Sequence, residues 1–319
     1  MELVHNYQVS FNELHTERFD FIIAASGYQK RCTYLAENLD TKGSDNLVIT
    51  FNEQTKSALR LENERIFQKL GFDSIKAAPD EHSDIEGMMQ RICNGKMART
   101  LNILVDYSCM TKVWCATIIK YLLKNDFHAD RINIYFSYTP KKVNILPQKF
   151  RLKSYAPLIF NSEKSLKKKP IALIAGLNNN FEMIKELIDE LKPSNTLALI
   201  PYFMHDGEYY QKIIDNNAPI LKTIPSEKVL KYPAERPDQI SSMITSLCLD
   251  LRLDSSVILV PQGPKPFSLA SILLSVRYPD VMIYDLKSKD HKTKEDPGLP
   301  AGEPVILKSV FCPEEDEDY

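Results

Sequence analysis

The chain alternates between two patterns of hydrophobic and polar positions. Short, continuous apolar runs such as residues 46–51, 101–108 and 255–262 are typical of strands buried on both faces of a sheet. Longer segments between them carry apolar residues at helical spacing, as in the stripe Leu177, Phe181, Ile184, Leu187, Ile188 and Leu191. Strands that alternate with helices predict βαβ units, whose right-handed crossovers place helices on both faces of a parallel sheet.

The order of predicted elements occurs twice, with an offset of about 150 residues. The predicted strands 19–27, 46–51, 74–79, 101–108 and 132–139 correspond to 170–176, 196–203, 218–225, 255–262 and 280–286. Even the trailing fragments correspond, Leu152-Lys153-Ser154 with Leu307-Lys308-Ser309. The sequence therefore predicts an α/β protein of two similar Rossmann-like α/β/α sandwich domains with mainly parallel sheets.

Repeat and charge together suggest the domain boundaries. The first domain is expected at residues 1–142 and the second at residues 170–312. Residues 141–169 hold nine basic residues and one acid, so 143–169 is expected to be an exposed basic connector. This connector is either a solvated linker or a contact for nucleic acid. The acidic tail, residues 313–319, is expected to be a solubilising end.

Composition is typical of a globular protein, with 44 % hydrophobic and 26 % charged residues. No apolar run approaches the roughly 20 residues that cross a bilayer, and the N-terminus lacks the regions of a signal peptide. The six cysteines are scattered without a CxxC pair, and no Cys/His group has zinc spacing. We therefore expect a cytoplasmic protein with no membrane partner, no disulfide framework and no metal.

Three of the ten glycines mark the expected ligand side. Gly27, Gly176 and Gly263 stand where a predicted core strand passes into a helix. Doubly wound sheets bind ligands outside the carboxyl ends of their strands, and a helix N-terminus there suits phosphate. The alternative is that these glycines only make tight turns. Both the dinucleotide fingerprint and the Walker A motif are absent, so no cofactor is expected.

Two lysines follow the strongest predicted strand of each half. Lys112 and Lys265 open the next helix, where a positive charge opposes the helix dipole. Binding a phosphate would explain them, whereas a solvated turn is the simpler alternative. Arg31, shortly after Gly27, is a further candidate for bidentate phosphate binding, with a solvated first turn as the alternative.

These loops resemble those of the CRISPR-associated Rossmann fold (CARF) family and the related SAVED domains. DYSCMTKVW matches the family's strand–loop–helix motif at Asp106, Ser108, Thr111 and Lys112, with Met110 in place of a glycine. VPQGPKPFSLA resembles the same loop at Gly263 and Lys265, with Pro261 in place of the acid. ASGYQKR, with Gly27 and Arg31, and AGLNNN, with Gly176 and Asn178, resemble the family's other ligand loop.

The resemblance implies a sensor. Members of this family bind cyclic or linear oligoadenylates or related second messengers across a paired-domain cleft, in bacterial antiviral defence. No recognised effector domain is fused to this sequence, so the resemblance implies a separate effector protein or a larger assembly as partner. The first hypothesis is therefore a binding module for an anionic, nucleotide-type ligand.

Two other hypotheses remain. The same cleft would serve a nucleotide hydrolase or transferase with Asp106, Cys109 and His205 as catalytic candidates. Each candidate also has a structural explanation: a capping carboxylate, a small buried thiol and an exposed turn, respectively. The third hypothesis is a scaffold subunit that binds nucleic acid through residues 141–169.

Overall fold

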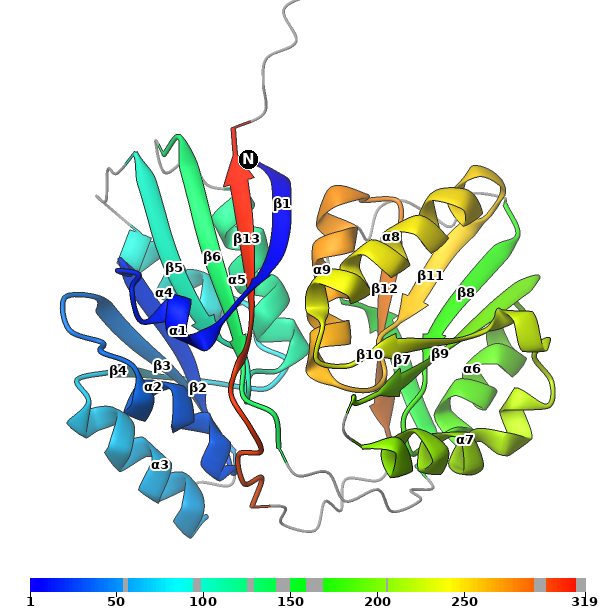
Figure 1. Ribbon diagram of the computed structural model, residues 1–319, viewed down its shortest axis with the longest axis horizontal. Helices are drawn as coiled ribbons and strands as arrows, with labels where there is room; N and C mark the ends of the chain where they lie inside the picture. The colour runs from blue at the N-terminus through cyan, green and yellow to red at the C-terminus, as the bar shows by residue number, and fades with distance from the viewer. Residues whose placement is uncertain are drawn as a thin grey trace, which may run out of the picture. The chain divides into compact units, whose positions relative to one another are not determined.

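The computed structural model describes residues 1–53, 57–93, 99–124, 129–141, 150–158, 169–204, 206–289 and 297–313, with only the backbone of Ile92 and Cys93. The chain forms two compact units, shown in Figure 1. Unit 1 consists of Met1–Lys142 and Thr293–Tyr319, and unit 2 consists of Val143–Lys292.

Unit 1 is built on a seven-stranded sheet with the order β1-β13-β6-β5-β2-β3-β4. Its strands are β1 (Glu2–Val9), β2 (Phe21–Ser26), β3 (Asp45–Phe51), β4 (Asp73–Ala77), β5 (Thr100–Asp106), β6 (Arg131–Tyr138) and β13 (Val305–Cys312). Strands β2 to β6 pair in parallel, whereas β13 is antiparallel to both β6 and β1.

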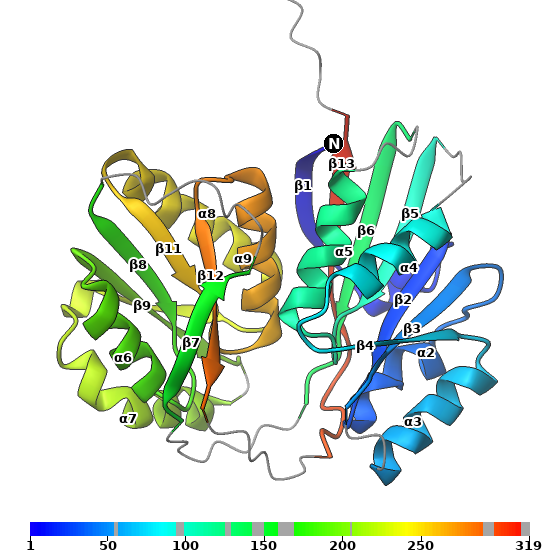
Figure 2. The same ribbon diagram turned by 180° about the vertical axis from the view of Figure 1, so that it is seen from behind.

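Helices cover both faces of this sheet. One face carries α1 (Phe11–Leu14), η1 (Lys30–Cys32), α2 (Tyr34–Asn38) and α3 (Ala58–Lys69), and the other carries α4 (Ser83–Cys93) and α5 (Lys112–Lys124), as Figures 1 and 2 show from opposite sides. Burial on both faces explains the apolar runs. Every residue of β2 is buried, and β5 and β6 are buried except near the residue at which each strand begins.

Unit 2 has a six-stranded sheet with the order β10-β9-β8-β11-β12-β7. Its strands are β7 (Leu152–Pro157), β8 (Ile171–Gly176), β9 (Asn195–Tyr202), β10 (Val229–Pro233), β11 (Ser256–Val260) and β12 (Met282–Ser288). One face carries α6 (Glu182–Leu191) and α7 (Gly207–Leu221); the other carries α8 (Pro237–Asp254) and α9 (Lys265–Arg277), and η2 (Ser226–Lys228) precedes β10.

The five parallel strands have the same spatial order in both units. Numbered in chain order, these strands follow one another across the sheet as 3-2-1-4-5. The order is β4-β3-β2-β5-β6 in unit 1 and β10-β9-β8-β11-β12 in unit 2. This is the order of a Rossmann-like fold. The predicted fold class, two similar α/β/α sandwiches with mainly parallel sheets, is confirmed.

The last strand of each half crosses to the other unit. β7 follows β6 along the chain but pairs antiparallel with β12, whereas β13 follows β12 but pairs antiparallel with β6. In Figure 1 the red strand β13 accordingly lies among the blue and green strands of unit 1. The fragments Leu152-Lys153-Ser154 and Leu307-Lys308-Ser309 therefore lie in strands that hold equivalent places in exchanged sheets, each antiparallel to the fifth parallel strand.

This exchange changes the domain boundaries expected from the sequence. Residues 293–312 belong to unit 1 rather than to the second domain, and β7 lies within the segment expected to be a connector. The units are joined by two chain crossings, because each sheet completes itself with a strand from the other repeat. The rest of the expected connector lies largely outside the described residues, as do residues 314–319 of the expected acidic tail.

One predicted strand is instead the end of a helix and the turn after it. Residues 218–225 were expected to match β4, but α7 extends to Leu221 and the matching strand is β10. Helical spacing of the buried residues Ile213, Asn217 and Ile220 continues through Pro219. A proline in the last turn disturbs few helical hydrogen bonds, so it does not end the helix there. None of the described helices has both the length and the apolar character needed to span a membrane.

Candidate functional site

The strand order creates a switch point in each sheet. In unit 1 the chain leaves β2 toward one face and the neighbouring β5 toward the other, and β8 and β11 do the same in unit 2. Loops after these strands meet at the carboxyl edge of the sheet, where doubly wound folds bind ligands. We call the edge formed after β2, β5 and β6 the unit 1 edge, and the edge formed after β8, β10 and β11 the unit 2 edge.

The unit 1 edge brings together residues from both predicted ligand loops. A Cβ on Gly27 would lie 3.4 Å from Cys109 Cβ, so the loop after β2 contacts the loop after β5. Asp106 is buried, and one of its carboxylate oxygens accepts the Ser108 N–H at 3.0 Å. The hydroxyl of Ser108, also buried, accepts the Thr139 N–H at 2.8 Å and ties this loop to the end of β6.

Arg31 lies at this edge but is buried, with only 4 % of its surface exposed. Its Nη1 donates to the Thr139 carbonyl at 2.9 Å, and its Nε donates to Gln29 Oε1 at 2.8 Å. Its guanidinium carbon is 5.2 Å from the centre of the Tyr138 ring. Burial lowers the pKa of Arg31, but Tyr138, Cys109 and Asp106 more than offset this, so the pKa lies above its usual value. Arg31 is thus a fixed internal cation rather than a solvent-facing side chain.

Several hydroxyls of the unit 1 edge are buried without a hydrogen-bond partner in the described part of the chain. They are Ser26 Oγ, Ser137 Oγ and Thr139 Oγ1. Ser137 pairs with Asp106 in the sheet register, so these groups lie near the switch point. Ser26, Tyr138 and Thr139 are not among the site residues predicted from the sequence, although polar residues at the ends of otherwise apolar strands were the available signal.

Thr111 and Lys112 begin α5. The Thr111 hydroxyl accepts the Trp114 N–H at 3.1 Å, so its oxygen caps the helix. Lys112 is the first residue of the helix and is partly exposed. Trp114 is fully buried, and its Nε1 donates to the Ala78 carbonyl at 2.8 Å, which anchors the helix start beside the end of β4.

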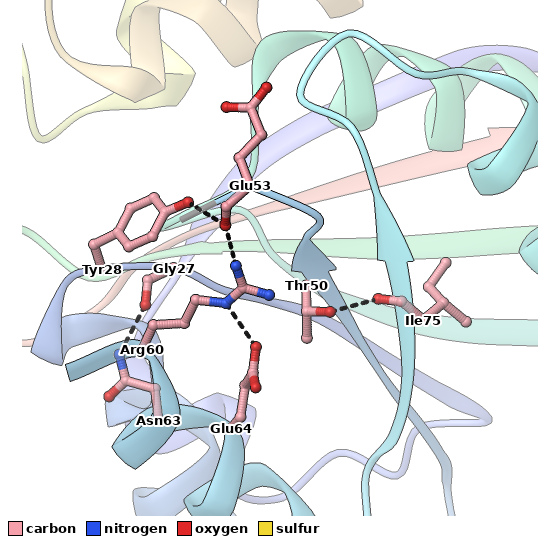
Figure 3. Close-up of polar contacts among 8 residues, drawn as sticks. All are labelled: Gly27, Tyr28, Thr50, Glu53, Arg60, Asn63, Glu64 and Ile75. Atoms are coloured by element: carbon pink, nitrogen blue, oxygen red, sulfur yellow. Dashed lines mark hydrogen bonds and ion pairs between the residues drawn. The ribbon is translucent and has the colours of Figure 1, made fainter. Parts of the chain in front are cut away.

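Helix α3 fixes the loop after β2, as Figure 3 shows. Asn63 is buried, and its Nδ2 donates to the carbonyls of Gly27 at 3.0 Å and Gln29 at 3.1 Å. Arg60, one turn earlier, is also buried; it forms an ion pair with Glu64 at 2.7 Å and donates to the Glu53 carbonyl. These contacts tie the loops after β2 and β3 to α3.

The unit 2 edge repeats one of these contacts. Asn217 of α7 is fully buried, and its Nδ2 donates to the Asn178 carbonyl at 2.6 Å. Asn178 in turn donates from Nδ2 to Gln262 Oε1 at 3.1 Å and accepts the Asn180 N–H at 2.8 Å. The amide of Asn178 is therefore engaged in joining the two loops of its own edge.

Gly176 is packed against the chain itself. A Cβ there would lie 2.3 Å from the Gln262 carbonyl oxygen and 2.4 Å from the Phe267 ring, closer than real Cβ contacts. The glycine is thus required by the close approach of two loops, and protein atoms already occupy the space beside it.

Gly263 has a different constraint. Its φ of +122° favours glycine, and a Cβ would lie 2.9 Å from the Tyr232 hydroxyl. Tyr232 is fully buried, and its hydroxyl has no hydrogen-bond partner among the described residues. Burial raises the pKa of Tyr232 well above its usual value. Gly263 therefore accommodates an internal side chain.

Lys265 is the first residue of α9 and is partly exposed. It stands between Pro264 and Pro266, which have no N–H, and the Phe267 N–H donates to the Pro264 carbonyl at 3.1 Å. The start of α9 consequently offers fewer backbone donors than expected for a phosphate cradle near Gly263.

The catalytic candidates are not assembled into a described triad. Asp106, at the end of β5, is buried, and Cys109, in the loop after β5, is partly exposed. His205 lies outside the described residues. Within the described ranges, no group of three or more His, Cys, Asp or Glu side chains could hold a metal ion. Neither a protein-family model nor a curated protein matches this chain.

Proposed function

We propose that this protein is a binding module for an anionic, nucleotide-type ligand, and that the ligand contacts the unit 1 edge. The observation that carries the proposal is the convergence of Arg31, Asp106, Ser108 and Lys112 at one switch point from two separate loops. Switch points of this fold class are where nucleotides bind. Fixed positive charge beside a helix N-terminus favours phosphate in particular.

The roles divide between buried and exposed groups. Buried Arg31 supplies a permanent positive charge beneath the edge, and partly exposed Lys112 can reach a phosphate directly. Ser108 holds the loop to the Thr139 N–H, so the loop is ordered before the ligand arrives. Asp106, which orients the loop by accepting the Ser108 N–H, would read a ribose hydroxyl or an exocyclic amine, because carboxylate oxygens accept hydrogen bonds from both kinds of donor.

The resemblance of these loops to CARF and SAVED domains extends the proposal. It makes an oligoadenylate or related second messenger the preferred ligand, and bacterial antiviral defence the preferred context. Ligand binding would then change the conformation passed to a separate effector protein. Lys265 would make the unit 2 edge, considered by itself, a weaker phosphate site than the unit 1 edge, because the prolines around it leave few backbone N–H groups to donate.

Isothermal titration calorimetry with linear and cyclic oligoadenylates, ATP and inorganic phosphate tests this proposal. We expect Lys112→Ala to weaken the best of these ligands about ten- to a hundredfold, the loss of one charge-assisted contact. Lys124→Ala is the matched control, because Lys124 is an exposed lysine in the last turn of the same helix. If both variants weakened binding equally, the ligand would be attracted by the general positive charge of the protein. That result would contradict a site at the unit 1 edge.

Turnover separates the sensor from the enzyme hypothesis. The same mixtures, analysed by anion-exchange chromatography after incubation, should return every nucleotide unchanged. Hydrolysis that Asp106→Asn abolishes would replace the sensor by a nucleotide-processing enzyme at this edge.

A further inference from the structure

Two thiols from different loops meet at the unit 1 edge. Cys32 belongs to η1 and is 1 % exposed, whereas Cys109 belongs to the loop after β5 and is partly exposed. The two side chains are within hydrogen-bonding reach of each other, and Cys109 packs against the core cluster that contains Cys32. Both also lie beside Gly27: its N–H donates a hydrogen bond to the Cys32 sulfur, and a Cβ added to it would be 3.9 Å from Cys109 Sγ.

Their environments give the two thiols different roles. Cys32 is shielded from solvent, and burial raises the pKa of its thiol well above the usual value, so it stays protonated. Cys109 is partly exposed and lies near Arg31, so an oxidant from solvent reaches its sulfur before that of Cys32. A partly exposed attacking thiol with a resolving thiol beside it is the arrangement of a redox-sensitive pair.

We propose that Cys32 and Cys109 form an oxidation site that a hydroperoxide converts to a reversible disulfide. The Cys109 sulfur attacks the peroxide; an S–O bond forms, the O–O bond breaks, and one oxygen leaves as water or alcohol. The Cys32 sulfur then attacks the Cys109 sulfur; the S–S bond forms, the S–O bond breaks, and water leaves with the Cys32 proton. The two cysteines lose two electrons, which reduce the peroxide.

The disulfide would change the loop after β5. Cys32 cannot move easily, because the neighbouring N–H groups of Lys30 and Arg31 donate to the carbonyls of Pro297 and Gly298. Closing the S–S bond therefore draws Cys109 toward η1 and strains the Ser108–Thr139 hydrogen bond. Because of this strain, we expect the oxidised protein to bind the nucleotide ligand more weakly than the reduced protein. This expectation rests on the proposed function.

The oxidation itself is tested without any nucleotide. The full-length protein is treated with graded hydrogen peroxide, its remaining thiols are alkylated, and non-reducing peptide mapping locates cross-links. We expect one cross-linked pair, between the peptides of Cys32 and Cys109, with the loss of two hydrogens and complete reversal by dithiothreitol. A parent protein in which Cys109 is oxidised but not joined to Cys32 overturns the proposal.

Variants fix the order of events. Cys32→Ala should stop at a Cys109 sulfenic acid that dimedone traps, and Cys109→Ala should leave Cys32 reduced. Cys312→Ala is the matched control, because Cys312 is also partly exposed but lies on β13; its cross-linking should equal that of the parent. Cross-linking that survives in Cys109→Ala contradicts the pair. Titration of the oxidised and the reduced parent protein with the nucleotides then measures how far the disulfide changes nucleotide affinity. Failure to bind a nucleotide and failure to form the disulfide are therefore separate outcomes.

Discussion

The two carboxyl edges have the same topology but different contents. At the unit 1 edge, buried Arg31 and Asp106 place charge beneath two loops that touch at ordinary contact distance around Gly27. At the unit 2 edge, Gly176 lets the Gln262 backbone and the Phe267 ring close against it. The shared strand order thus creates a switch point in both units, but the side chains differ there. Charged side chains lie at the switch point of unit 1, whereas backbone and a ring pack closely at that of unit 2.

A shared contact makes the difference sharper. Asn63 and Asn217, on the helices that follow the second parallel strand of each unit, both donate to the loop after the first strand. Arg31 and Asn180 also occupy matching places and are equally buried, but Asn180 bonds to the Phe150 carbonyl and carries no charge. The frame of the two edges is therefore common, and charge is what distinguishes unit 1.

The largest expected effect comes from adding one methyl group at each first-strand glycine. Gly176→Ala should destabilise unit 2 by about 3 kcal/mol or more, because its Cβ would overlap backbone and a buried ring. Gly27→Ala, the matched change, should cost about 1 kcal/mol or less, since its nearest neighbours are 3.4 and 3.5 Å away. Urea unfolding followed by circular dichroism measures both.

The single tryptophan sharpens this test. Trp114 is buried in unit 1, so its fluorescence reports on that unit alone. In Gly176→Ala the dichroism transition should move to lower urea while the Trp114 transition moves less. A variant as stable as the parent by dichroism would show that unit 2 accepts the methyl group and that its edge is open.

The next effect concerns the buried charge. Arg31→Met keeps the length of the side chain but leaves the Thr139 carbonyl without its donor, at a cost of about 1.5–3 kcal/mol to unit 1. Adding Asp106→Asn should recover part of this loss, because the neutral amide no longer needs a cation nearby. Trp114 fluorescence during urea unfolding checks both variants, and additive losses in the double variant would show that the two charges are independent.

A smaller effect should be equal in the two units. Asn63→Ala and Asn217→Ala each remove a buried amide that holds the loop after the first strand, and each should cost about 1–3 kcal/mol. Thermal unfolding by circular dichroism compares them directly. If one variant were neutral and the other strongly destabilising, the two asparagines would not be equivalent parts of a common frame.

The smallest effect is a pH dependence of the stability of unit 1. Burial, the largest cause, holds the pKa of His82 below its usual 6.5, so the folded unit binds this proton less tightly than the unfolded chain. Stability should therefore be full above about pH 6.5 and decline as the pH falls below it. No described residue of unit 2 is a histidine. The urea midpoint followed by Trp114 fluorescence should depend less steeply on pH in His82→Gln than in the parent protein. An unchanged dependence would exclude His82 as its cause.

The loops of the candidate site were predictable, but the states of their side chains were not. Short apolar strands followed by Gly27, Asp106 and Lys112 indicate the carboxyl edge of the sheet, because strand ends and helix starts are visible in local patterns. Nothing local indicated that Arg31 is buried against the Thr139 carbonyl or that Cys32 lies beside Cys109. Both contacts join segments that are distant along the chain, and their existence depends on the final packing of loops at the sheet edge.

The sequence by itself determined the alternation of strands and helices, their twofold occurrence and thus two α/β/α sandwiches, because burial imposes a period on each element wherever it lies. Only the tertiary structure decided which sheet each trailing strand joins. The fragments Leu152-Lys153-Ser154 and Leu307-Lys308-Ser309 have the same pattern, and either sheet offers an antiparallel position beside its fifth parallel strand. A strand's pattern specifies which face is buried, whereas the choice of partner depends on long-range pairing that no local pattern encodes.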